Sequence, residues 1–202
     1  MEEVSSLLVR LNLATRQYHA DVDEPWLALL RPSVGIADYV ATLIRTYGLV
    51  APFESACKYT PGLLELLDFR QHMRAGLIAQ DLLALGVTPL QVATIETCPT
   101  ISIFPTVANA LGWLYVMERS TLLHDGIRRH LQRDLWQLDR ACAYLRACGA
   151  HVGDRWAAFG RLLDRVGRDP TTANEIVHAS RDAFGICGRW SRLQAKQARS
   201  TG

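Results

Sequence analysis

The 202-residue sequence lacks the features that would place it in several common classes of protein. No stretch approaches about 18 consecutive apolar residues, the length of a transmembrane helix. The first residues also lack the basic-then-apolar order of a signal peptide. The five cysteines are an odd number, with no CxxC pair and no histidine at zinc-finger spacing, which argues against a disulfide framework and against a structural metal. We therefore expect a cytoplasmic protein with reduced thiols and no membrane contact.

The usual catalytic motifs are missing as well. The sequence contains no glycine-rich phosphate loop, no HExxH, no GxSxG elbow and no paired carboxylates on one helix face. No cysteine has a histidine near it in sequence that could activate it as a nucleophile. The formal net charge of +2 predicts no partner, and the basic residues of the last third recur at helical intervals among apolar ones, which is typical of a solvated helix face. We expect no nucleic-acid binding.

Helical periodicity dominates what is present. The stretch 107–131 is the longest helical pattern without a proline, and its wide apolar stripe predicts a central helix buried on several sides. Ser5 and Ser6 are candidate N-caps for the first helix, and Gly86 is a candidate C-cap. Further helical segments are expected at 3–22, 34–59, 63–85, 135–148, 154–166 and 172–197. Because alternating strand patterns are absent, we predict one all-α domain over 1–202 with roughly seven to nine helices.

One histidine has a suggestive setting. At 100° per residue, His19 lies in line with Leu8 and beside Thr15, so its ring follows one flank of the buried stripe of the first helix. Asp23, four residues later, can accept a hydrogen bond from the second ring nitrogen, which is the usual way to fix the tautomer of a ligating histidine. The alternative is a structural histidine that packs near a helix end.

Four separated segments carry a further pattern: LNLATRQYHADVD at 11–23, RAGLIAQDLLALG at 74–86, GWLYVMERSTL at 112–122 and YLRACGAHVGDRWAAFGRLLD at 144–164. Together, and in this order, they resemble the heme oxygenase family, specifically its bacterial biliverdin-producing branch that is associated with phytochromes. The first segment resembles the family's ATR-x-x-H, whose histidine is the proximal iron ligand. The third resembles the distal-helix motif G-x-LYVLEGS-x-LGG, and the other two resemble its R…L…DL…LG and YG…RW-x-x-F segments.

The resemblance implies a heme oxygenase-like helical bundle that holds heme, as substrate and cofactor, between the first and the central helix. His19 would be the iron ligand and Asp23 the carboxylate partner of its ring. Ser120 would belong to a distal water network that steers oxygen. Side chains implied near the heme propionates are Arg10, Arg16, Tyr115, Arg155 and Arg161. The implied enzyme is an oxidoreductase that cleaves heme to biliverdin, CO and iron with dioxygen and electrons from a reductase or ferredoxin, with a phytochrome as a further partner.

The chain departs from the distal motif at all three glycines of LEGS-x-LGG, where it has Arg119, Leu123 and His124. Glycine lets the distal backbone lie against the porphyrin, because it has no Cβ. Each overfilled position costs about 1–3 kcal/mol, whereas nanomolar binding amounts to only about 12 kcal/mol. Three hypotheses therefore stand: an active heme oxygenase, a non-catalytic binding or regulatory module with a filled pocket, and a bis-histidine heme binder in which His124 reaches iron from the distal side.

Overall fold

The computed structural model describes residues 5–149 and 152–200, and within those residues it contains eleven α-helices and no β-strand. The predicted all-α class is thereby confirmed, although the predicted seven to nine helices were too few. The helices are α1 Ser6–Thr15, α2 His19–Leu27, α3 Ile36–Lys58, α4 Leu63–Leu66, α5 Ala75–Ala84, α6 Pro89–Ala93, α7 Val107–Ser120, α8 His124–Asp134, α9 Ala143–Gly149, α10 Val152–Val166 and α11 Pro170–Ser200. No helix in the described part of the chain is long and apolar enough to cross a membrane.

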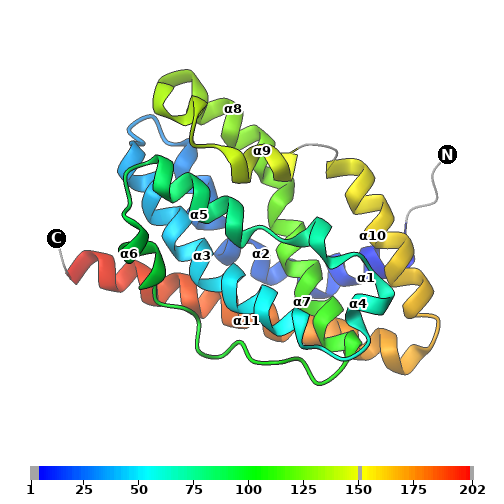
Figure 1. The fold of residues 1–202 in the computed structure, drawn as a ribbon. Helices are drawn as coiled ribbons and strands as arrows, with labels where there is room; N and C mark the ends of the chain where they lie inside the picture. The colour runs from blue at the N-terminus through cyan, green and yellow to red at the C-terminus, as the bar shows by residue number, and fades with distance from the viewer. Residues whose placement is uncertain (1–4, 150–151, 201–202) are drawn as a thin grey trace.

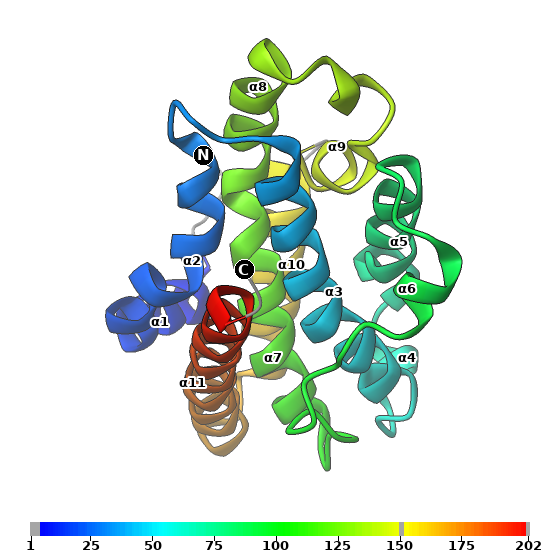
Figure 2. The same ribbon diagram turned by 90° about the vertical axis from the view of Figure 1, so that its left-hand side faces the viewer.

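Helix α7 lies at the centre of the bundle (Figures 1 and 2). It packs most extensively on α11, which runs along one side of the molecule, and α1 and α2 also pack on α11. One apolar cluster joins α1, α7, α10 and α11, and a second joins α2, α3, α5, α8 and α9. Both clusters meet α7 or its continuation, so this helix positions the rest of the chain.

The predicted uninterrupted helix at 107–131 is wrong. Helix α7 ends at Ser120, a 3-10 turn follows at Thr121–Leu123, and α8 begins at His124. Two hydroxyls lie at the break: Ser120 Oγ donates to the carbonyl of Met117, and Thr121 Oγ1 donates to the carbonyl of Glu118, each at 2.7 Å. Side-chain hydroxyls that bond to backbone carbonyls compete with the helical ladder and bend it.

The predicted first helix is also divided. Helix α1 ends at Thr15, whose Oγ1 donates to the carbonyl of Leu11 at 2.8 Å, and a 3-10 turn at Arg16–Tyr18 leads into α2. Consequently His19 is the first residue of α2 and not a residue near the end of one long helix. Similarly, segment 63–85 forms α4, a 3-10 turn and α5, and segment 135–148 forms a 3-10 turn and α9.

Of the predicted caps, Ser5 and Gly86 are confirmed, whereas Ser6 is the first residue of α1. Ser5 Oγ accepts a hydrogen bond from the amide of Leu8 at 3.2 Å, which satisfies one of the free amides at the start of α1. Gly86 follows α5 with φ +90°, a left-handed conformation that glycine adopts without steric cost.

Candidate functional site

His19 lies where α2 begins, next to α11. Its Nε2 is 3.1 Å from Thr15 Oγ1, and its ring packs against Phe184 with centroids 5.2 Å apart. Burial lowers the pKa of His19 below its ordinary value, and the nearby Arg119 cation lowers it further, although Asp23 acts in the opposite direction. The imidazole is therefore neutral near pH 7, the form that binds a metal ion.

Asp23 does not partner the His19 ring. Both of its carboxylate oxygens accept from Arg119 on α7: Nη1 lies 2.7 Å from Oδ1, and Nη2 lies 2.9 Å from Oδ2. The pair is mostly buried, with 17% of the Arg119 side chain and 11% of the Asp23 side chain exposed. The expected hydrogen bond between His19 and Asp23 is thus replaced by a two-point ion pair that joins α2 directly to α7.

Aromatic side chains fill the region around this ion pair. Tyr115 on α7 is fully buried, and its ring centroid lies 5.9 Å from that of Trp156 on α10 and 6.2 Å from that of Phe184. Tyr18 stacks on the same Phe184 ring at 6.2 Å. Phe184 therefore bridges the residues around His19 and the central helix, a role that the sequence did not suggest.

Two empty spaces border these helices. A cavity of about 60 Å³ lies among α2, α3, α7 and α11 and is lined by Trp26, Met117 and Ser120 among others. A wider groove of about 800 Å³ lies between α1 and α10, with Trp156 and Arg161 along it. His19, Asp23 and Arg119 line neither space, so the described side chains occupy the region between α2 and α7 at the histidine.

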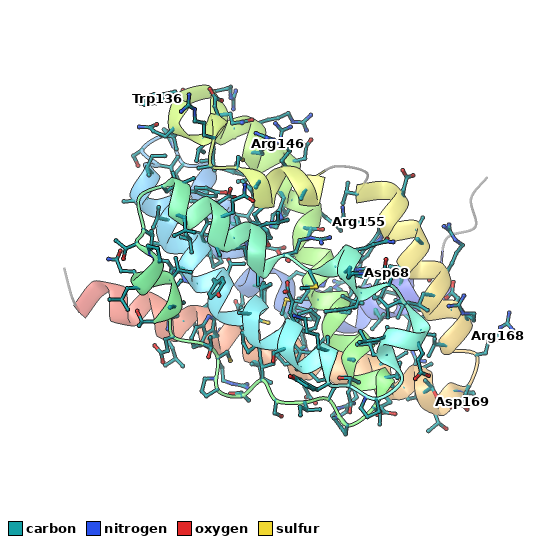
Figure 3. The ribbon with its side chains drawn as sticks, viewed as in Figure 1. Asp68, Trp136, Arg146, Arg155, Arg168 and Asp169 are labelled. Carbon is teal, nitrogen blue, oxygen red and sulfur yellow. The ribbon has the colours of Figure 1, made fainter. Side chains whose placement is uncertain are left out.

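A buried polar cluster stands beside the 60 Å³ cavity. The carboxylate of Glu118 lies 2.9 Å from His72 Nδ1, 3.7 Å from Arg74 Nη2 and 3.4 Å from Arg155 Nε. Burial alone would raise the pKa of Glu118, but the His72 hydrogen bond and the two arginine charges outweigh it, so the pKa lies below its ordinary value. Arg155, near the start of α10 (Figure 3), also donates to Thr121 Oγ1. The sequence did not point to a site at His72, Arg74 and Glu118, although Arg74 and Glu118 lie within the motif segments 74–86 and 112–122.

The other two glycine positions of the distal motif are occupied by Leu123 and His124, which pack against apolar and aromatic side chains. His124 is completely buried, with its ring 4.5 Å from Trp26 and 4.9 Å from Tyr144, and neither ring nitrogen has a hydrogen-bond partner. Burial, together with the Arg74 and Arg155 charges, lowers its pKa to about 3. Leu123 packs against the second apolar cluster. Leu123, four residues after Arg119 and expected on the same side of the central helix, thus packs against core residues, and His124 belongs to the core.

The remaining predicted residues are dispersed. Ser120 Oγ is bonded to the backbone of its own helix. Arg10 is exposed and bonded to Asn174 on α11, Arg16 is exposed in the 3-10 turn, and Arg161 is exposed along the α1–α10 groove. The structure thus brings His19, Asp23 and Arg119 to one region, together with Tyr115, one of the predicted propionate contacts. Of the other predicted propionate contacts, Arg155 pairs with Glu118, and the exposed side chains are Arg10, Arg16 and Arg161.

The fit to heme is partial. The donor set suits heme iron, because His19 is a neutral imidazole at the edge of the bundle. The space between α2 and α7 is too small for the macrocycle. Ligand pockets usually measure about 300–1,000 Å³, whereas the cavity lined by both α2 and α7 measures about 60 Å³. Arg119 takes up the space between the helices by binding Asp23. As folded here, the region between α2 and α7 does not accommodate a porphyrin.

Comparison with known proteins identifies the fold and the family. No curated protein matches the chain. Among solved structures, a crystal structure of NO- and CO-bound heme oxygenase from Neisseria meningitidis has a TM-score of 0.73 and 23% sequence identity, covering 93% of this chain and 91% of that one. The family model described as heme oxygenase matches residues 5–192. Because that match spans nearly the whole chain, the resemblance is confirmed at the level of the family, and the chain belongs to the heme oxygenase family.

Proposed function

We propose that this protein is a heme oxygenase that cleaves heme oxidatively to biliverdin, CO and iron, using dioxygen and reductase electrons. Family membership and the all-α fold support a heme-degrading function in general. The observation that carries the specific proposal is His19, a neutral imidazole at the start of α2 with α7 across from it. On this proposal His19 holds the iron, and Thr15 Oγ1 orients its ring.

The proposed reaction needs two kinds of partner. Electrons must come from a reductase or a ferredoxin, because none of the described side chains is a redox centre that could supply them. The product biliverdin needs an acceptor, for which we propose a phytochrome, in keeping with the branch that the sequence motifs resemble. Ser120 lines the 60 Å³ cavity and is the proposed contributor to oxygen steering.

A hemin titration followed by turnover tests the proposal. The parent protein should give a Soret band at one hemin per chain and, with oxygen and a reductase, the red absorbance of biliverdin. His19→Ala should displace the band and abolish turnover, since imidazole is the best iron ligand available on that helix. His178→Ala is the matched control, because 78% of that side chain is exposed on α11. An unchanged spectrum in His19→Ala would rule out the proposed ligand.

One observation favours a second function. The Arg119–Asp23 pair occupies the space that the family motif leaves to heme, as expected for a non-catalytic binding or regulatory module on the same fold. Folded protein that gives no Soret band at any hemin concentration would establish this alternative. The bis-histidine alternative has no comparable support, because His124 would have to leave its place between Trp26 and Tyr144 to reach iron. An unchanged hemin spectrum in His124→Ala would dismiss it.

A further inference from the structure

The contact between Arg119 and Asp23 is unusual for its position. In the motif that the chain resembles, the position of Arg119 belongs to glycine, which could make no side-chain contact with α2. Here the guanidinium reaches across from α7 and binds both oxygens of the Asp23 carboxylate. A charge-assisted, two-point contact of this kind is both strong and specific in direction.

We propose that the Arg119–Asp23 ion pair is a latch that holds α2 against α7 and keeps the heme site closed until it opens. This inference rests on the proposed function, since it concerns access to the same site. It explains how the family's ligand histidine and a filled cleft coexist in one chain: the structure described here is the closed state, and heme binds the open one.

The surroundings of the pair suit a contact that breaks and re-forms. Helix α2 has only nine residues and contains Pro25, so few backbone hydrogen bonds hold the helix itself together. A further ion pair from α2 to another helix, Asp21 with Arg192 of α11 at 2.9 Å, is exposed to water. The side chains of Arg119 and Asp23 are each more than four-fifths buried yet not sealed. Water can therefore reach both charges as soon as the helices begin to separate. A fully enclosed pair would lose its ion contact before water could replace it.

A latch has a defined effect on binding. When only the open state binds a ligand, the apparent dissociation constant equals the intrinsic one divided by the open fraction. Weakening the latch therefore tightens hemin binding without any new contact to hemin. The observed rate of hemin binding should level off at high hemin concentration, because opening then limits it.

Four variants separate a latch from a simple steric block. Asp23→Asn and Arg119→Met each remove the ion pair while keeping similar bulk. The double variant Asp23→Arg with Arg119→Asp restores a pair in reversed order. Asp21→Asn is the matched control, since it removes an aspartate–arginine pair from the same helix at an exposed position. Circular dichroism first checks that each variant is folded, and the reversed pair remains available where a single variant is not.

Two readouts are needed. Without hemin, amide hydrogen exchange of α2 should rise at least about tenfold in Asp23→Asn and Arg119→Met, return toward the parent in the reversed pair and stay unchanged in Asp21→Asn. With hemin, the same two single variants should bind about tenfold more tightly and reach a higher plateau rate. Unchanged exchange in the single variants overturns the latch even where hemin binds well. Faster exchange with no hemin binding in any variant instead overturns the proposed function, and with it the role of the latch.

Discussion

Two positions on α7, 112 and 119, differ in whether they carry glycine. Near its start, Gly112 lies so close to α11 that a Cβ there would be 2.7 Å from both the Ala179 Cβ and the Ile176 carbonyl oxygen. At its other end, Arg119 stands where the family motif has glycine, and it extends to Asp23 of α2. Glycine is thus present where α7 packs on α11, and an arginine is present where α7 contacts α2.

This contrast separates what the fold requires from what the site requires. At Gly112 the backbones of α7 and α11 approach too closely for a side chain, so the packing of these helices requires glycine there. A glycine facing the ligand is needed only for the ligand. The chain has the fold of the family, and we propose that Arg119 changes the surface that would meet heme. The following experiments test the packing and the surface separately.

The largest effect is expected at His124 in acid. Its pKa of about 3 lies below the value of about 6.5 that an unfolded histidine has. Below pH 6.5 the unfolded chain therefore binds a proton that the folded chain does not, so the free energy of unfolding falls as the pH falls toward 3. From pH 7 to pH 4.5 this group alone should remove about 2–3 kcal/mol. Denaturant unfolding at both pH values should show the loss in the parent and its absence in His124→Leu; equal losses in the two proteins would contradict the burial of a neutral imidazole.

The next largest effect tests the close contact between α7 and α11 at Gly112. Gly112→Ala should lower the free energy of unfolding by up to about 2 kcal/mol net, because overpacking costs about 1–3 kcal/mol and alanine in a helix gains back about 1 kcal/mol. Gly126→Ala is the control: it lies in α8, where an added Cβ meets nothing within 4 Å, so it should stabilise the protein slightly. Urea unfolding measures both, and a neutral Gly112→Ala would mean that α7 and α11 can move apart.

The smallest effect concerns the energy of the ion pair itself. A double-mutant cycle on Asp23 and Arg119, with each replaced by alanine, should give a coupling free energy of about 1–2 kcal/mol. The same cycle on Asp21 and Arg192, whose side chains are 62% and 59% exposed, should give less than about 0.5 kcal/mol. Coupling energies of equal size would show that burial adds nothing to the Arg119–Asp23 contact.

The helical segments and their caps were predictable from the sequence. The interruptions of helices at serine and threonine hydroxyls were not. Apolar spacing placed the helical segments, and the caps at Ser5 and Gly86 follow from residue chemistry. The interruption after Ser120 depends on whether hydroxyls bond to the preceding turn. Serine and threonine occur both inside and at the ends of helices, so their presence does not decide the outcome.

The site was predictable one residue at a time but not as a set of contacts. The setting of His19 on a flank of the first helices was visible in its spacing, and Arg119 was recognised as an obstacle. The contact between Arg119 and Asp23 was not predictable, because the two residues are 96 positions apart in sequence. His19, only four residues from Asp23, is the partner that spacing alone suggests. Phe184 lies against His19 from α11, and only the packing of α11 on the first two helices reveals it.

We propose that His19 is the iron ligand and that Arg119 closes the site in which heme would bind. The most direct measurement is a hemin titration of Arg119→Gly beside the parent, followed at the Soret band. Leu123 and His124 stay unchanged, because they pack in the core. Glycine there costs about 1 kcal/mol of stability relative to alanine, which the fold can tolerate. The account predicts binding at least about tenfold tighter in Arg119→Gly, with the band lost when His19→Ala is added. Equal affinity in the two proteins would contradict it.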